Sequence, residues 1–509
     1  MLKNGSQRWH ISLIVGCGVV VRLMYHLAYQ PWWCGDSIGY SRSFWEWAHG
    51  TFPDAGRPPI YPLFLGFAQW ICGSQASLRL SVPAAYTTVI LQNLLGLAAA
   101  CLLYRTLRFL RSKVGPALVA ALVFCFIGAV AQFETLILTE SLSLFSLVLA
   151  AYLFVRTMQG LEDGRRVQYL AFWTGLAFSF AVLVRLENLV FFVALLLVLG
   201  ALFLRLRFRQ GRAQQTRALA KVLLFLPLGL TPLLLAWMTL NRIGIRQFTL
   251  TTITGPQMTQ SVYNLFDKVD PEDRVLREVM NRYYRETNTP GHVDREFFWR
   301  GHDELIARYT ELPIKVKHWD RIQIDVNAYV GRVCWKLVRK YPGVWLRNAA
   351  GSFPETFNFR FTQTSAGEHN DPQSVNGGSV IRRERLWRTA VWLNRVEAPF
   401  LTLLYCITLF ALVAGAIALF RGRNEHLLTD VTVCALAAGT VGTFAAICLL
   451  ESFHNQYAEP HLGVLLMCSF YLVHRGALRN RWRRRKSNVG ESDAGPETNG
   501  FYLPAGSLG

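Results

Sequence analysis

Apolar runs long enough to cross a lipid bilayer recur along the whole chain, and they constrain its fold more than any other feature. A transmembrane helix needs about 20 mainly apolar residues, and by that measure the sequence holds about ten such segments. Of its 509 residues, 52% are hydrophobic and only 17% are charged, whereas a soluble domain carries about 25% charged residues. The sequence therefore predicts an all-α polytopic membrane protein.

The predicted spans form two groups separated by a long polar segment. They are Ile11–Tyr29, Ala85–Tyr104, Pro116–Gln132, Thr135–Val155, Tyr169–Val184, Leu189–Leu204 and Val222–Leu240, then Pro399–Phe420, Leu428–Leu450 and Pro460–His474. We therefore divide the chain into an N-terminal transmembrane module, a mostly helical extracytoplasmic insertion, the C-terminal transmembrane helices, and a basic tail that we expect to be disordered. These parts cover residues 1–240 (with a first outer loop at 31–84), 241–397, 398–475 and 476–509.

Basic residues mark every second loop of this arrangement. The formal net charge is +20, and the lysines and arginines gather where apolar segments end, as in the loop Arg205–Lys221 and the tail Arg475–Lys486. By the positive-inside rule, both termini are cytoplasmic, and the first outer loop and the insertion are extracytoplasmic. We expect a multi-pass protein of the inner or plasma membrane. The same clustering argues against a nucleic-acid partner and favours contact with anionic membrane lipids.

The first outer loop combines a carboxylate, an arginine and aromatic side chains. Asp36 follows the first span, and Arg57 opens the run Arg57-Pro58-Pro59-Ile60-Tyr61-Pro62. A carboxylate here can take the proton from an attacking hydroxyl, a contribution of roughly 10²–10⁴-fold. The alternative is that Asp36 only caps an interfacial helix. The neighbouring arginine motif favours a catalytic Asp36, with Tyr40 and Tyr61 lining the site.

Arg57 and Arg185 are the natural partners of an anionic substrate. Both lie in outer loops that are otherwise nearly free of positive charge, so neither is needed for topology. Arg185 belongs to a turn so short that its guanidinium must lie at the membrane face. Snorkelling to the headgroups is one explanation. The functional alternative is a bidentate contact with a lipid phosphate, because cations that neutralise a departing phosphate stabilise the transition state.

Acidic residues also lie between the third and fourth predicted spans, on the outer side. A carboxylate so close to lipid is costly unless it is paired or hydrated. We favour Glu140 over Glu134 as a site residue, with three roles open: orienting the acceptor, holding a metal, or pairing with an arginine. Arg22, inside the first span, is interpreted as structural.

Before the last span, His454 and Tyr457 are further candidates to line the site. Interfacial anchoring explains Tyr457 equally well.

The order and common outer location of these motifs resemble the GT-C glycosyltransferases. The closest resemblance is to the branch that holds protein O-mannosyltransferases and the aminoarabinose transferase of lipid A. It covers the first two hundred residues well, the last span partly, and the insertion hardly at all. Relatives often have Arg-Tyr-x-x-Pro before the last span, where this chain has Gln456 in the arginine position.

The resemblance implies a fold, a reaction and roles for individual residues. The fold is GT-C-like, and the donor is a sugar linked to a polyprenyl phosphate. Asp36 would be the general base of an inverting transfer to an extracytoplasmic hydroxyl on a protein, lipid or glycan. Glu140 matches the second acidic position of the family, and Arg57 and Arg185 match its basic residues at the donor phosphate.

No metal or other cofactor is expected, because a monophosphate donor can react without one. His292, Asp294, His302 and Asp303 do not have a known metal-ligand spacing. A Cys34–Cys72 disulfide stays open.

Three alternatives to this function also stay open. One is a flippase or transporter of lipid-linked sugars, which would place charged residues along a path through the bundle. Another is a polysaccharide polymerase or ligase that uses a pyrophosphate-linked donor. The third is a non-catalytic membrane subunit with a binding ectodomain.

Overall fold

Long helices packed side by side form the membrane region of the computed structural model. It describes residues 4–33, 35–53, 56–208, 213–287, 297–315, 321–357, 373–374, 381–421, 427–450 and 459–475. The helices of this region are α1 (Asn4–Ala28), α4 (Val82–Phe109), α5 (Val114–Phe126), α6 (Gly128–Phe133), α7 (Glu140–Glu162), α8 (Gln168–Val184), α9 (Asn188–Arg207), α10 (Ala213–Ile245), α17 (Glu384–Arg421), α18 (Leu427–Leu450) and a final apolar helix, Leu462–Arg475.

The described residues contain seven helices long and apolar enough to cross a membrane, and four shorter apolar helices. Every predicted span overlaps one of these eleven helices, the shorter ones being Ile60–Ile71, Val114–Phe126, Gln168–Val184 and Leu462–Arg475. The prediction of an all-α polytopic membrane protein is confirmed, and the number of spans stays a prediction.

The third and fourth predicted spans differ from the observed helices in where the helices end and begin. The helix breaks at Ile127, which is extended (φ −66°, ψ 109°), and α7 begins only at Glu140. The intervening backbone pairs elsewhere: the N–H of Ile137 donates to the carbonyl of Trp32 at 3.2 Å, and the Gln92 side chain donates to the carbonyls of Glu134 and Leu136 at 3.0 and 2.8 Å. A non-helical segment is thus held between helices with its polar groups satisfied, as burial at this depth requires.

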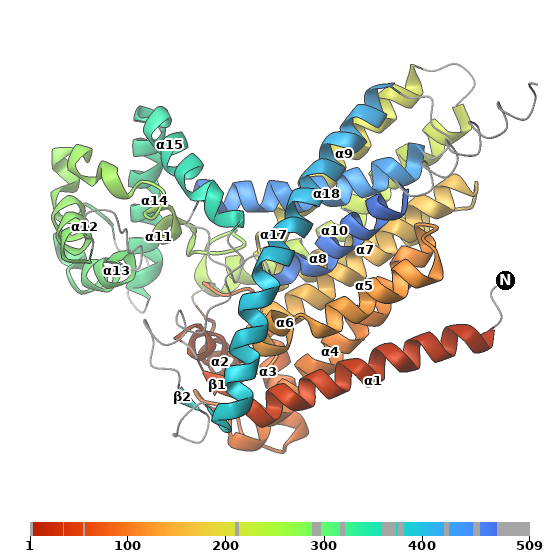
Figure 1. The fold of residues 1–509 in the computed structure, drawn as a ribbon. Helices are drawn as coiled ribbons and strands as arrows, with labels where there is room; N and C mark the ends of the chain where they lie inside the picture. Colours follow the sequence, from red (N-terminus) through yellow and green to blue (C-terminus); the bar gives the residue numbers. More distant parts are fainter. Residues whose placement is uncertain are drawn as a thin grey trace, which may run out of the picture.

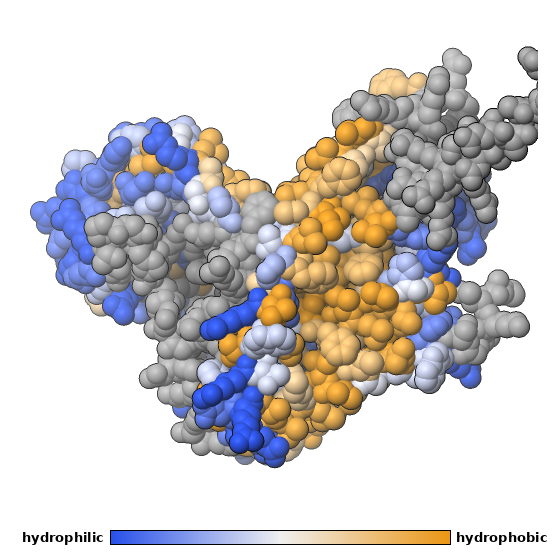
Figure 2. All heavy atoms as spheres, in the orientation of Figure 1, coloured by the Kyte–Doolittle hydropathy of each residue, from blue (hydrophilic) through white to orange (hydrophobic). Residues whose placement is uncertain are grey.

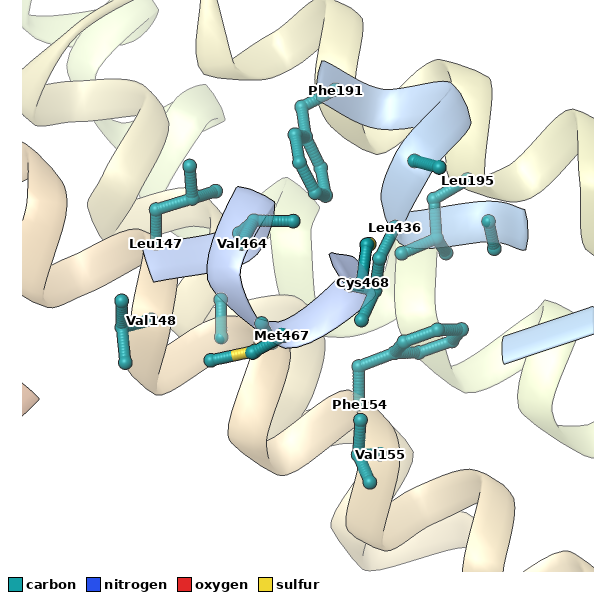
Figure 3. Close-up of a cluster of buried hydrophobic side chains, with 14 of the residues drawn as sticks. Leu147, Val148, Phe154, Val155, Phe191, Leu195, Leu436, Val464, Met467 and Cys468 are labelled. Atoms are coloured by element: carbon teal, nitrogen blue, oxygen red, sulfur yellow. The ribbon is translucent and has the colours of Figure 1, made fainter. Parts of the chain in front are cut away.

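The hydrophobic core of the bundle is densely interdigitated. Figure 3 shows side chains of α7, α9, α18 and the final helix meeting in one cluster, with Leu147, Val148, Phe154, Val155, Phe191, Leu195, Leu436, Val464, Met467 and Cys468 labelled. Elsewhere α8 and α10 approach so closely that a Cβ on Gly175 would lie 2.0 Å from the carbonyl oxygen of Leu226, and one on Gly229 would lie 2.0 Å from that of Phe172. Small residues allow such close approach of helices in membranes.

The insertion is mostly helical, as predicted, and has its own core. It contains α11 (Thr254–Met258), α12 (Arg274–Thr287), α13 (Phe297–Ala307), α14 (Ile322–Lys340), α15 (Pro342–Ser352) and short 3₁₀ turns at Tyr263–Lys268, Pro271–Asp273, Tyr309–Glu311 and Phe353–Phe357. Apolar side chains of α11 to α14 pack into a second cluster. Figure 1 shows this lobe at one end of the bundle and the N-terminus at the other, and Figure 2 shows a hydrophilic lobe beside an apolar bundle.

Two helices and a short ladder fill the first outer loop. They are α2 (Gly35–Ala48), α3 (Ile60–Ile71) and β1 (Trp32–Trp33), which pairs antiparallel with β2 (Gln373–Ser374) of the insertion. Interfacial helices in this loop were predicted.

The Trp- and Arg-rich segment Leu386–Arg395, which the sequence predicts to lie on the membrane surface, belongs to the first part of the continuous helix α17. Polar contacts hold it against the bundle. The Tyr25 hydroxyl donates to Asn394 at 3.0 Å, and Glu397 accepts from the first backbone N–H groups of α6 at 2.6 and 2.8 Å.

Candidate active site

Asp36 and Arg57, both in the first outer loop, form an ion pair. Asp36 lies in the first turn of α2, so it is a helical residue and not the cap before the helix. Arg57 precedes the Pro58-Pro59 pair from which α3 starts, and its guanidinium contacts the Asp36 carboxylate and lies 4.8 Å from the centre of the Tyr40 ring. Burial alone would lower the pKa of Arg57, but Asp36 and Tyr40 raise it above its ordinary value. The Asp36 side chain is 44% exposed, so a substrate can reach it.

A second ion pair joins the break between α8 and α9 to the start of α7. Arg185 Nη1 lies 3.0 Å from Glu140 Oε1, and the two side chains are only 9% and 3% exposed. Arg185 also pairs with Glu187. Its backbone is extended (φ −146°, ψ 121°), which ends α8 and turns the chain into α9. Asn188 fixes this turn by donating to Ser143 and to the carbonyl of Ala181, at 3.1 and 3.0 Å.

Tyr40 is within electrostatic range of both ion pairs. Its ionisation is influenced by Arg57 and Asp36 from one pair and by Arg185 and Glu140 from the other, so all four charges are within electrostatic range of one buried phenol. Burial raises the pKa of Tyr40, which keeps it neutral at physiological pH. The Tyr61 ring meets Tyr40 edge-on at 5.1 Å. The structure therefore brings together six predicted site residues: Asp36, Tyr40, Arg57, Tyr61, Glu140 and Arg185.

The other candidates have different positions. Glu134 pairs with Arg22 inside the bundle, with Arg22 Nη2 2.6 Å from Glu134 Oε1, which agrees with the structural role predicted for Arg22. His454 and Tyr457 lie outside the described residues.

Three residues that the sequence analysis missed support this site. Gln92 accepts from the Tyr61 hydroxyl at 2.9 Å while it holds the segment before α7. Asn188 fixes the Arg185 turn. His461, 1% exposed, stacks on Phe191 at 5.8 Å and is within electrostatic range of Arg185. Polar residues inside apolar spans were the available signal.

The expected absence of a metal stays a prediction. Among the described residues, the acidic groups close enough to share a cation are Asp270, Glu272 and Asp273 in the insertion. Lys336 already pairs with Glu272 at 3.0 Å, and Lys340 pairs with Asp270 at 3.4 Å.

Cys72, considered for a disulfide, is a free thiol in contact with the Thr87 hydroxyl at 3.1 Å. Cys34 lies outside the described residues.

Solved structures of three membrane glycosyltransferases are similar to this chain. The Saccharomyces cerevisiae protein O-mannosyltransferase Pmt1-Pmt2 complex bound to the sugar donor is 16% identical, over 51% of this chain and 37% of that one, with a TM-score of 0.39. Archaeoglobus fulgidus oligosaccharyltransferase AglB, in complex with an inhibitory peptide and a dolichol-phosphate, is 12% identical over 96% and 52%, with a TM-score of 0.44. Cupriavidus metallidurans ArnT bound to undecaprenyl phosphate is 14% identical over 88% and 77%, with a TM-score of 0.37.

The chain therefore spans 37% and 52% of the length of the first two of these proteins. Because every TM-score is below 0.5, these likenesses add no detail to the site. No curated protein matches the chain.

A family model gives the more specific finding. Residues 13–250 match the model of dolichyl-phosphate-mannose-protein mannosyltransferase. This region runs from α1 to α10 and includes Asp36, Arg57, Glu140 and Arg185. The match confirms the resemblance predicted from the motifs: over residues 13–250, this chain is similar to the dolichyl-phosphate-mannose-protein mannosyltransferase family of GT-C glycosyltransferases.

Proposed function

We propose that this protein transfers a sugar from a polyprenyl-phosphate donor to an acceptor hydroxyl on the extracytoplasmic side of the membrane, with inversion at the anomeric carbon. One observation carries the proposal: the Asp36–Arg57 and Glu140–Arg185 pairs are both within electrostatic range of Tyr40. A reachable carboxylate and two guanidinium groups beside one buried phenol are what a base and a phosphate leaving group require.

In this mechanism Asp36 acts as the general base. The acceptor oxygen attacks the anomeric carbon as its proton passes to the Asp36 carboxylate. The bond between that carbon and the phosphate oxygen breaks, and its electron pair stays on the phosphate. Arg57 contacts Asp36. In this mechanism its guanidinium also faces the phosphate leaving group, so Arg57 links the base to the donor. A carboxylate in this position contributes roughly 10²–10⁴-fold.

Arg185 and Glu140 form the inner wall of the proposed phosphate site. Because Arg185 is held by Glu140 and Glu187, its guanidinium is preorganised and need not be ordered when the donor binds. Preorganised charge stabilises a transition state more effectively than charge that must first reorient. Glu140 is therefore assigned the role of orienting Arg185.

The alternative of a flippase or transporter predicts charged side chains free to line a path through the bundle. The charged side chains described inside the bundle include Arg22 and Glu134, which pair with each other, and Glu397, which caps α6. These contacts favour structural roles for them. In this proposal both termini are cytoplasmic. The insertion is extracytoplasmic and would select the acceptor.

Reconstitution with radiolabelled polyprenyl-phosphate sugars tests the proposal. Asp36→Asn should lower transfer by roughly 10²-fold or more while donor binding persists. Arg42→Gln, on the exposed side of the same helix, is the matched control and should leave transfer unchanged. Transfer that survives Asp36→Asn excludes this base. Lipid scrambling without transfer favours a flippase, and activity only with pyrophosphate-linked donors favours a polymerase or ligase.

A further inference from the structure

One face of α12 carries four arginines. Arg274, Arg277, Arg282 and Arg285 line an open groove of about 570 Å³ together with Glu278, Asn281 and Glu286. The opposite face, with Val275, Leu276, Val279 and Met280, packs into the core of the insertion. That packing fixes the direction of the arginine face, which we define as Arg274, Arg277, Arg282 and Arg285.

The described lining of this groove keeps a net positive charge, because four arginines face two glutamates, Glu278 and Glu286, which leaves a formal charge of +2. Arg282 pairs with Glu304, and Glu278 is drawn towards Arg308, whose Nη1 lies 3.7 Å from its Oε1. Within the described part of the chain, no ion pair involves Arg274, Arg277 or Arg285. These guanidinium groups are therefore available to an external anion.

The lining indicates what kind of anion fits. The lining residues that the structure describes carry charged or amide side chains, whereas protein partners typically bury aromatic and aliphatic groups at the centre of an interface. Figure 1 shows α12 on the side of the lobe away from the membrane helices, which favours a soluble polymer over a bilayer surface. Guanidinium groups three to five residues apart, about 4.5–7.5 Å along the helix axis, suit a hydrophilic polymer with repeated phosphates, each bound by a planar fork of donors.

We propose that the arginine face of α12 binds the phosphate groups of an anionic glycan and so brings an acceptor polymer to the same side of the membrane as Asp36. The proposal that this face binds phosphate groups rests on the groove alone. Only the statement that the bound polymer is an acceptor rests on the proposed function.

The test measures binding to the full chain in detergent, with fluorescently labelled phosphorylated dextran as the probe. The triple variant Arg274→Gln, Arg277→Gln, Arg285→Gln should weaken binding by about tenfold or more, because charge-assisted contacts are lost. The matched control Arg300→Gln, Arg332→Gln, Arg339→Gln removes the same charge from exposed positions of α13 and α14 and should bind like the wild type. Equal thermal midpoints for the two variants show that both are folded.

Several outcomes overturn the proposal. Equal loss in both triple variants would mean that net charge alone attracts the probe. Equal binding of unmodified dextran would exclude phosphate recognition, and binding only to phosphatidylglycerol vesicles would assign the arginine face to a lipid surface.

A separate transfer assay keeps the two proposals distinguishable. Wild type should glycosylate phosphorylated dextran better than unmodified dextran, and the groove variant should lose that preference while Asp36→Asn loses transfer to both. If no glycan is glycosylated although the probe binds, the acceptor assignment fails and the binding site stands.

Discussion

Arg22 Nη2 lies 2.6 Å from Glu134 Oε1, and the two side chains are only 4% and 1% exposed. This pair distinguishes two acidic residues that lie close together in the sequence: Glu134 is tied to α1, whereas Glu140 is tied to Arg185. A buried ion pair contributes little compared with a well-packed apolar pair, but removal of one partner leaves an uncompensated charge.

We therefore predict that Glu134→Ala destabilises the protein by about 3–5 kcal/mol, measured by thermal or denaturant unfolding in detergent. The double variant Arg22→Met, Glu134→Leu should recover most of that loss. Glu46→Ala, which breaks the exposed Arg42–Glu46 pair, should cost at most about 1 kcal/mol. A Glu134→Ala protein as stable as the wild type would contradict a structural role for this pair.

Glu140→Gln should both raise the donor KM and lower kcat, because the variant loses the charge that orients Arg185 towards the phosphate in the bound donor and in the transition state. A rise of about tenfold corresponds to the loss of about 1.4 kcal/mol of binding. Glu187→Gln is the comparison. Glu187 also pairs with Arg185, but its side chain is more exposed than that of Glu140, so this variant should have the smaller effect. If Glu140→Gln instead removes kcat at unchanged KM, Glu140 takes part in the chemistry itself.

The close crossing of α8 and α10 predicts a sharp difference between glycines. Gly175→Ala and Gly229→Ala each place a methyl group 2.0 Å from a backbone oxygen of the facing helix, so each should cost about 1–3 kcal/mol as the helices are forced apart. A Cβ on Gly200 in α9 meets nothing within 4 Å, so Gly200→Ala should be neutral or slightly stabilising. Unfolding midpoints of the purified variants provide the measurement.

The insertion should lose stability in acid through Glu304. Burial alone would raise the pKa of this carboxyl, but hydrogen bonds from Arg282, Tyr283 and Arg308 lower it below the usual 4.5. A lowered folded-state pKa stabilises the fold above the unfolded pKa and loses that contribution as pH falls through the folded value. Hydrogen exchange of α12 and α13 should therefore accelerate below about pH 4.5. Glu304→Gln should remove this pH dependence, and the exposed neighbour Asp303→Asn should retain it.

Transfer should continue after divalent cations are removed. In the proposed mechanism Arg57 and Arg185 supply the positive charge that a metal would otherwise place at the phosphate. Activity after extensive dialysis against EDTA should match the untreated protein, and added Mg²⁺ or Mn²⁺ should not increase it. Loss of activity on chelation, with recovery on adding metal, would show that the arginines do not suffice.

The helical architecture could be predicted because apolar length is a local property. Each predicted span overlaps a helix. The helical spacing of apolar residues in Asp320–Tyr341 likewise predicts a helix, which is observed as α14, Ile322–Lys340. The ends were harder, since they depend on tertiary contacts. The helix predicted to begin at Thr135 starts at Glu140, because Trp32 and Gln92 bind the backbone before it.

The same distinction applies to the candidate site. The charges at Asp36, Arg57, Glu140 and Arg185 could be recognised from residue type and outer location. Their grouping into the pairs Asp36–Arg57 and Glu140–Arg185 depends on how the helices pack, which no local pattern contains. The supporting roles of Gln92 and His461 were missed because each belongs to a segment that the hydropathy pattern treats as lipid-embedded or interfacial.

The short antiparallel ladder between Trp32–Trp33 and Gln373–Ser374 has a structural consequence. The strand of the first loop ends just before α2, on whose first turn Asp36 lies. Main-chain pairing therefore joins residues more than three hundred positions apart in the sequence beside the helix that bears the proposed proton acceptor. A substitution that breaks this pairing is expected to alter transfer although it touches no proposed site residue.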